Sequence, residues 1–172
     1  MKEVKIIQNM NRAMEIMHNV GAWMEKSGLN PSKWWKSRNM NRKFMLKHTE
    51  PEEYYVAMVD DKPVASMVLQ ETERNQSWKS VDGNSPKKAL YVHWLCVHRN
   101  FAGQGFPIRM IDYATKVAKK RGFNRLRLDT NADEKKLCKI YKDLGFSLVG
   151  SEVERKHTTA FFEKEIGSNV VH

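Results

Sequence analysis

Two glycines, Gly103 and Gly105, lie where a turn between a strand and a helix could bind a phosphate group. Residues 89–97 before them are nearly all apolar, which is typical of a strand buried on both faces of a sheet. A helical pattern follows the turn. Such a turn leaves several backbone N–H groups without partners, and the helix adds a partial positive charge at that end. The pattern therefore predicts a phosphate-binding corner.

Two other interpretations of this turn stay open. A dinucleotide-binding fingerprint would need a third glycine, but Ile108 occupies that position, and no new βαβ unit precedes the turn. A purely structural Gly-x-Gly turn would need no ligand at all.

The two cysteines, Cys96 and Cys138, predict neither a disulfide framework nor a metal site. They fall in a predicted buried strand and a predicted helix, without Cys-x-x-Cys spacing and without a histidine at metal-ligand spacing. Neither has an evident base beside it, so packing is favoured over a role as a covalent acyl carrier. We expect no metal and a reducing, cytoplasmic environment.

The length of 172 residues predicts one domain, residues 1–172. No apolar run is long enough for a signal peptide or a membrane span, so a soluble protein without membrane contact is expected. The net charge of +10 favours a partner of opposite sign. Charge alone does not distinguish a solvated surface from attraction of an anionic cofactor or of RNA, and no motif of a known RNA reader is present.

The order of predicted elements indicates an α+β fold. Before the glycine turn we expect a strand at 2–8, a helix at 9–27 with inward methionines, a helix at 33–46, strands at 54–59 and 63–69 joined as a hairpin, and a long polar connection at 71–88. After the turn we expect a helix that closes at 119–122, a strand at 125–129, a helix at 133–144, and strands at 146–149 and 159–163.

Two motifs together resemble the GNAT superfamily of acyl-CoA-dependent N-acyltransferases. The glycine turn, residues 102–107, is similar to the family's phosphate-binding turn, and residues 141–146 match its Tyr-x-x-x-Gly-Phe signature. Ala102 stands where the family commonly has Arg or Gln, and Pro107 where it commonly has Gly or Ala. The phosphate contact depends mainly on main-chain N–H groups, so the missing side chain at Ala102 should weaken the contact rather than abolish it. The first turn of a helix tolerates Pro107, although proline removes one N–H donor.

The resemblance implies an αβα arrangement, with a central mixed, mostly antiparallel twisted sheet of six to seven strands flanked by about four helices. It places a cofactor core at 89–149 and acceptor-side elements at 9–47, 71–88 and 150–166. The oligomeric state it implies is a monomer or a homodimer.

The resemblance also implies acetyl-CoA as the cosubstrate and direct transfer of the acetyl group to a primary amine. A backbone N–H within Leu95, Cys96 and Val97 would face the thioester carbonyl, and the same segment would pair with the pantetheine arm. The residues implied to contact the diphosphate are Gly103, Gln104, Gly105, Phe106, Pro107 and Ile108.

Three side chains are candidates for proton transfer in such a reaction. Tyr141 is the expected general acid for the departing thiolate, although a tyrosine here could instead belong to the core. Asp129 is a candidate general base acting through water, with helix capping as its alternative. His93 is the other candidate base, and a lone strand histidine can instead be a hydrogen-bonded core residue.

The acceptor is expected to be a small-molecule or peptide amine. Trp34, Trp35 and Trp78 are candidate walls of its pocket, with ordinary packing as the alternative. A second class of function stays open: a non-catalytic, basic RNA- or protein-binding module that retains the fold. Nucleic acid is thus a possible partner, not one that a motif indicates.

Overall fold

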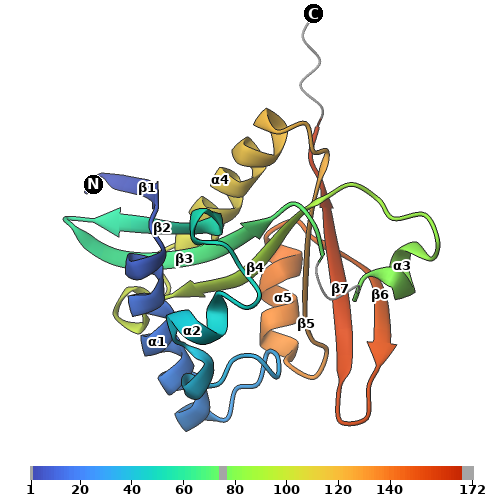
Figure 1. Cartoon of the computed structure of the whole chain (residues 1–172), viewed down its shortest axis with the longest axis horizontal. Helices are drawn as coiled ribbons and strands as arrows, with labels where there is room; N and C mark the ends of the chain where they lie inside the picture. The colour runs from blue at the N-terminus through green and yellow to red at the C-terminus, as the bar shows by residue number, and fades with distance from the viewer. Residues whose placement is uncertain (1, 74–76, 168–172) are drawn as a thin grey trace, which may run out of the picture. The chain divides into compact units, whose positions relative to one another are not determined.

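The structure is a computed structural model that describes residues 2–73 and 77–167. Its strands are β1 (Val4–Gln8), β2 (Tyr54–Val59), β3 (Lys62–Gln70), β4 (Leu90–Val97), β5 (Arg125–Asn131), β6 (Ser147–Val153) and β7 (Thr158–Glu165). Its α-helices are α1 (Met10–Ser27), α2 (Arg42–Met45), α3 (Lys79–Asp82), α4 (Phe106–Lys120) and α5 (Lys135–Asp143) (Figure 1). Short 3₁₀ helices are η1 (Ser37–Asn39), η2 (Pro51–Glu53) and η3 (Arg99–Phe101).

The strands form one seven-stranded sheet in the order β1-β2-β3-β4-β5-β7-β6. Strand β4 is parallel to β5, whereas β1 with β2, β2 with β3, β5 with β7 and β6 with β7 pair antiparallel. This mixed sheet with its helices confirms the predicted α+β fold class. In the described part of the chain, no helix is both long enough and apolar enough to cross a membrane.

The chain divides into two compact units. Within the described residues, the first unit comprises 2–69 and 93–113, and the second comprises 70–73, 77–92 and 114–167. Strand β4 and helix α4 both continue from one unit into the other, so the boundary does not fall in a linker. The single domain expected over residues 1–172 stays a prediction.

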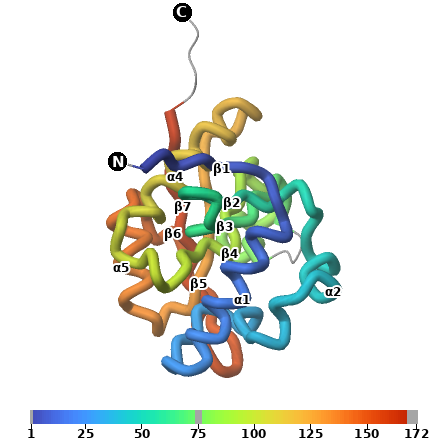
Figure 2. The backbone as a smooth tube through the Cα atoms, turned by 90° about the vertical axis from the view of Figure 1, so that its left-hand side faces the viewer, coloured from blue at the N-terminus to red at the C-terminus, as the bar shows by residue number. Residues whose placement is uncertain are grey.

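In the first unit, helix α1 (labelled in Figure 2) begins one residue after the predicted start and ends where predicted, because local sequence caps both of its ends. The Asn9 side chain accepts a hydrogen bond of 3.0 Å from the N–H of Arg12. Gly28 adopts φ 72°, and its N–H donates to the carbonyl of Met24. The apolar stripe of the helix is buried as expected, with Met10, Ala13, Ile16, Met17, Val20 and Met24 in the core.

The prediction of one helix over residues 33–46 is wrong. Only η1 and the four residues of α2 are helical there. Two asparagines divide the segment, because their side chains bond to the backbone in place of a helical ladder. Asn39 Nδ2 donates to the carbonyl of Trp34 (3.1 Å), and Asn41 Oδ1 accepts from the N–H of Phe44 (2.9 Å) and so begins α2 as a new helix.

The hairpin of β2 and β3 was predicted correctly, and its turn is tighter than expected. Asp60 and Asp61 both have positive φ, 48° and 61°, and Val59 pairs directly with Lys62. Two residues with positive φ are what a two-residue turn between antiparallel strands needs, because that backbone twist matches the twist of the strands.

In the second unit, the connection expected as a polar loop at 71–88 contains helix α3 and a buried tryptophan. Trp78 is 2% exposed and packs with Ala89, Tyr91 and Phe161. Its ring contacts Phe161 at 5.0 Å and Tyr91 at 6.0 Å between centroids. Residues 74–76 of this connection lie outside the described part of the chain.

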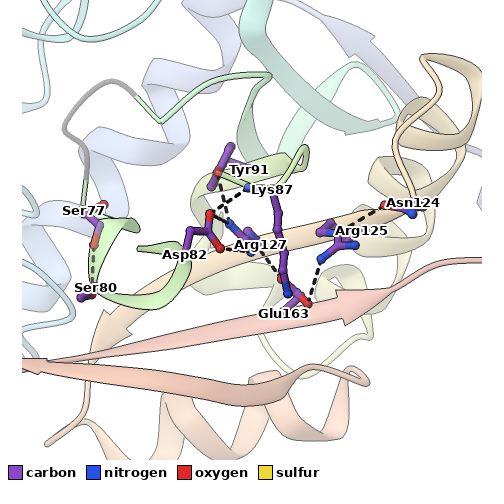
Figure 3. Close-up of polar contacts among 9 residues, drawn as sticks. All are labelled: Ser77, Ser80, Asp82, Lys87, Tyr91, Asn124, Arg125, Arg127 and Glu163. Carbon is purple, nitrogen blue, oxygen red and sulfur yellow. Dashed lines mark hydrogen bonds and ion pairs between the residues drawn. The ribbon is translucent and has the colours of Figure 1, made fainter. Parts of the chain in front are cut away.

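A buried ion network attaches this connection to the sheet (Figure 3). The Arg127 side chain on β5 is fully buried, and its guanidinium donates to both oxygens of Asp82 at 2.7 and 2.8 Å. Its Nε donates to Glu163 of β7 at 2.8 Å, and its guanidinium carbon lies 4.3 Å from the centre of the Trp78 ring. Because a buried charge is costly without partners, these contacts hold α3 against β5 and β7.

The ion pairs also set the protonation of their members. The Arg127 guanidinium lowers the pKa of Asp82 below its ordinary value of 3.8. Burial opposes the charge of Arg127, but its bonds to Asp82 and Glu163 outweigh burial and raise its pKa.

We predict that Asp82→Asn lowers the free energy of unfolding by about 3–5 kcal/mol, because Arg127 then stays buried with one ionic partner removed. Asp143→Asn is the control. Asp143 is 63% exposed in its pair with Lys139, so its loss should change stability by less than about 0.5 kcal/mol. Urea titration of both variants measures the difference, and equal, small effects would contradict the assigned role of the network.

The same pair predicts a pH dependence. Since the pKa of folded Asp82 is lowered, its contribution is present above pH 3.8 and is lost as the pH falls through the folded-state value. Below pH 3.8 the wild type should therefore lose stability more steeply than Asp82→Asn.

Candidate functional site

The glycine turn of the first unit connects η3 to α4. Gly103 and Gly105 have φ of 77° and 81°, a region that side chains with a Cβ rarely adopt. A Cβ added at either position would meet no atom within 4 Å. The glycines are therefore required for the backbone path, and the space above the turn is open.

Helix α4 begins at Phe106, immediately after this turn. The first N–H groups of a helix have no partner within it, and they carry the positive end of the helix dipole. Phe106 is buried and its ring lies 6.3 Å from that of Phe101, which fixes the start of the helix, whereas Ile108 is 57% exposed. The backbone N–H groups of the turn are therefore held in place by the buried ring of Phe106.

A cleft of about 420 Å³ in the first unit begins at this turn. Its lining residues are Lys2, Val4, Val59, Asp60, Lys62, Phe101, Gln104, Phe106 and Arg109. Lys2 pairs with Asp60 at 2.6 Å, which leaves Lys62 and Arg109 as further positive groups beside the turn. Sequence spacing could not group these cations, because Lys2 precedes β1, Lys62 lies on β3 and Arg109 lies on α4. Only the charge of Arg109, close to the glycines, was a signal.

Strand β4 departs from regular geometry before the predicted carbonyl-facing residues. Trp94 has φ 55°, which is strained for a residue with a large side chain. Its ring packs edge-on against Trp35 at 5.0 Å, and this contact holds the conformation. After this irregularity Cys96 is buried, and Leu95 and Val97 are half-buried.

Neither cysteine has the environment of a nucleophile. Burial raises the pKa of Cys96 to about 12, and its sulfur lies 3.4 Å from the Ser66 hydroxyl. Cys138 on α5 is half-buried, and its pKa is also raised, chiefly by burial. These placements agree with the packing roles expected from the sequence.

Tyr141 in the second unit lies near the end of α5 and is half-buried. Its ring is 5.8 Å from that of Phe162 on β7, and its carbonyl accepts a hydrogen bond from the N–H of Phe146. Gly145 has φ 94°, so the chain reverses there and returns Phe146 to the core. The glycine and phenylalanine of the motif therefore fix the backbone that carries Tyr141.

Asp129 is half-buried on β5 of the same unit. A carboxylate oxygen of Asp129 lies within 4.8 Å of one of Glu73, a residue that the sequence analysis did not select. The turn before α5 is capped by Asn131, whose Oδ1 accepts from the N–H of Asp133 at 3.0 Å. Glu73 could not have been found by spacing, because the connection in which it lies follows no periodic pattern.

The remaining candidates differ in exposure. His93, on β4 of the first unit, is half-buried. Trp78 and Trp35 are buried, 2% and 7% exposed, a placement that favours packing over a pocket wall. Trp34 is half-buried and lies beside Phe44 and His48, with ring centroids 6.1 and 5.0 Å away.

The sequence is similar to known acetyltransferases. The sequence matches the model described as the acetyltransferase (GNAT) family over residues 18–146. It is 35% identical over 80 residues to the uncharacterized N-acetyltransferase YesJ of Bacillus subtilis (strain 168), a match that covers 46% of this chain and 43% of that protein. The chain therefore matches less than half of the length of this relative.

Solved structures show the same fold. A GNAT family acetyltransferase from Streptococcus agalactiae 2603 has a TM-score of 0.75 at 15% identity, with 96% of each chain covered. One from Listeria monocytogenes 4b F2365 has a TM-score of 0.69 at 19% identity, covering 96% of this chain and 95% of that one. A Bacillus anthracis structure in complex with acetyl coenzyme A has a TM-score of 0.54 at 18% identity, covering 66% of this chain and 62% of that one.

We predict that thiol alkylation of the native protein at pH 8 modifies Cys138 and leaves Cys96 unmodified until the chain unfolds. Burial and the raised pKa near 12 leave Cys96 almost without thiolate at this pH. Mass spectrometry of peptides after timed iodoacetamide treatment, with and without urea, measures both rates. Native-state modification of Cys96 as fast as in urea would contradict its buried placement.

Proposed function

Because the chain belongs to the GNAT family of acetyltransferases, we propose that it is an N-acetyltransferase that transfers the acetyl group of acetyl coenzyme A directly to a primary amine. The acceptor amine is a small molecule or a peptide. The observation that carries this proposal is the turn of Gly103 and Gly105, which leaves open space over polar backbone at the start of α4.

The residues of the turn fit an anionic cofactor. The N–H groups of Gly103, Gln104, Gly105 and Phe106 would donate to the diphosphate, with the dipole of α4 adding to the attraction. Pro107 offers no N–H, so these four groups and Ile108 carry the contact. Lys62 and Arg109 in the adjoining cleft supply positive charge for the phosphates.

Bound acetyl coenzyme A supplies the acetyl group as a thioester. A backbone N–H within Leu95–Val97 would donate to the carbonyl oxygen of the thioester as that oxygen gains negative charge. The positive φ of Trp94 just before these residues interrupts the regular strand geometry, which supports N–H groups that point away from the neighbouring strand. Tyr141 would donate its phenolic proton to the sulfur as the carbon–sulfur bond breaks and the carbon–nitrogen bond forms.

A base must take the proton that the amine loses. Asp129 is our first candidate, since it is a half-buried carboxylate on β5 that could accept a proton through water. His93 is the alternative base. Of the three tryptophans, Trp34 keeps enough exposure to contact an acceptor.

We predict that Tyr141→Phe lowers the rate of coenzyme A release about 10²–10⁴-fold with an amine that the wild type accepts, because only the donated proton is removed. Acetyl-CoA affinity should change by less than about twofold. Tyr113→Phe is the control, since Tyr113 is also half-buried and packs on Tyr55. Free coenzyme A is quantified by chromatography across an amine panel. Undiminished turnover in Tyr141→Phe would exclude the proton-donor role.

We predict that Gly105→Ala weakens acetyl-CoA binding about tenfold or more, and that Gly122→Ala does not. The two glycines have nearly the same φ, 81° and 80°, open space around both, and positions at opposite ends of α4. Each substitution should cost about 1–2 kcal/mol of stability. Calorimetric titration measures the affinities, and an equal loss in both variants would assign the effect to stability alone.

A further inference from the structure

The segment at residues 32–48, here called the basic aromatic segment, has an unbalanced charge. Between Glu25 and Glu50 the sequence contains no acidic residue. The positive residues in that interval are Lys26, Lys33, Lys36, Arg38, Arg42, Lys43 and Lys47. A large part of the net charge of +10 therefore comes from one short stretch of the first unit.

Most of these cations are available to a partner. Within residues 2–73 and 77–167, no carboxylate lies at ion-pair distance from Lys33, Lys36, Arg38, Lys43 or Lys47, and all of these except the half-buried Lys36 are exposed. Arg42 donates to the side-chain oxygen of Asn11 at 3.0 Å and is also exposed.

The carboxylate of Glu25, on α1, already has hydrogen-bond partners. Glu25 accepts hydrogen bonds from the N–H and the hydroxyl of Ser37, at 2.9 and 2.7 Å. These bonds, together with Lys36 and Arg38, lower the pKa of Glu25. The carboxylate of Glu25 therefore stays charged and bonded to Ser37, and it does not form an ion pair with the lysines and arginines of the segment.

Three rings form a cluster among these cations. Trp34, Phe44 and His48 lie with centroids 5.0 to 6.1 Å apart, and each is half-buried. The ammonium of Lys33 lies 5.1 Å from the centre of the Trp34 ring. The segment follows α1 and includes η1 and α2. Figures 1 and 2 label α1 and α2 and show the chain running from one to the other.

We propose that the basic aromatic segment binds single-stranded nucleic acid. Its lysines and arginines pair with phosphates, and an unstacked base packs on the cluster of Trp34, Phe44 and His48. Proteins that bind single strands combine positive side chains along the phosphate backbone with aromatic side chains on which bases stack. An acidic peptide would use the charge but would have no need of three rings. This inference goes beyond the proposed acetyl transfer and does not depend on it.

The test is fluorescence anisotropy with the full chain, without acetyl-CoA, and a labelled 12-nucleotide strand made once as RNA and once as DNA. We expect a Kd of about 10⁻⁴–10⁻⁶ M or tighter at physiological salt. Lys43→Ala with Lys47→Ala should weaken binding and lower the slope of log K against log salt by about 1.4, which corresponds to two lost phosphate contacts. Binding of either strand supports the proposal, and the stronger one identifies the preferred sugar.

The charge-matched control is Lys135→Ala with Lys136→Ala, two exposed lysines on α5. It should leave both the affinity and the slope near those of the wild type. Trp34→Ala should weaken binding about tenfold through lost stacking, whereas Trp34→Phe should retain most of it. Thermal unfolding of each variant shows whether the segment is still folded.

Three results would overturn the inference. The first is no salt-dependent binding of either strand at 50 mM salt. The second is an equal loss in the α5 control, which would assign binding to the overall charge. The third is competition by poly-glutamate as effective as that by unlabelled strand, which would assign the segment to an acidic peptide partner.

Discussion

The N–H groups in the first turn of an α-helix cannot be paired within that helix, and the start of α4 depends on this constraint. Gly103 and Gly105 carry the chain into the helix through positive φ, and no atom of the described residues lies within 4 Å of the place that a Cβ would take on either glycine. The buried ring of Phe106 fixes where the helix starts. The rest of the proposed chemistry requires this arrangement, because the phosphates of the cofactor determine where its thioester lies. A turn with Cβ atoms at both positions would follow another path.

Much of the fold could be predicted because local signals agreed with the tertiary structure. Asn9 and Gly28 delimit α1, and its methionine stripe is buried as its period predicts. The prediction of a helix at 33–46 was wrong because it did not include the bonds that Asn39 and Asn41 make to the backbone. Sequence patterns detect a helix or strand from the regular recurrence of apolar residues on one face. A segment whose backbone is held by individual side-chain hydrogen bonds has no such regular recurrence.

The candidate site was only partly predictable, for a different reason. Motif spacing located the glycine turn and Tyr141, because each belongs to one continuous stretch. Contacts between residues far apart in the chain give no spacing signal in the sequence. The proximity of Glu73 to Asp129 and the cations around the cleft are examples. The burial of Arg127 was equally hidden, since an arginine in an alternating strand suggests a solvent-facing position until Asp82 and Glu163 are known to surround it.

The proposed function depends on binding of the acetyl coenzyme A diphosphate by the backbone of the glycine turn. This binding can be measured by following the amide resonances of the ¹⁵N-labelled protein during titration with acetyl-CoA. We expect the amides of Gln104, Gly105 and Phe106 to move downfield as they donate to phosphate oxygens, and to move further than any others in the chain. Saturable binding that leaves these three amides in place would show that the turn does not hold the phosphates.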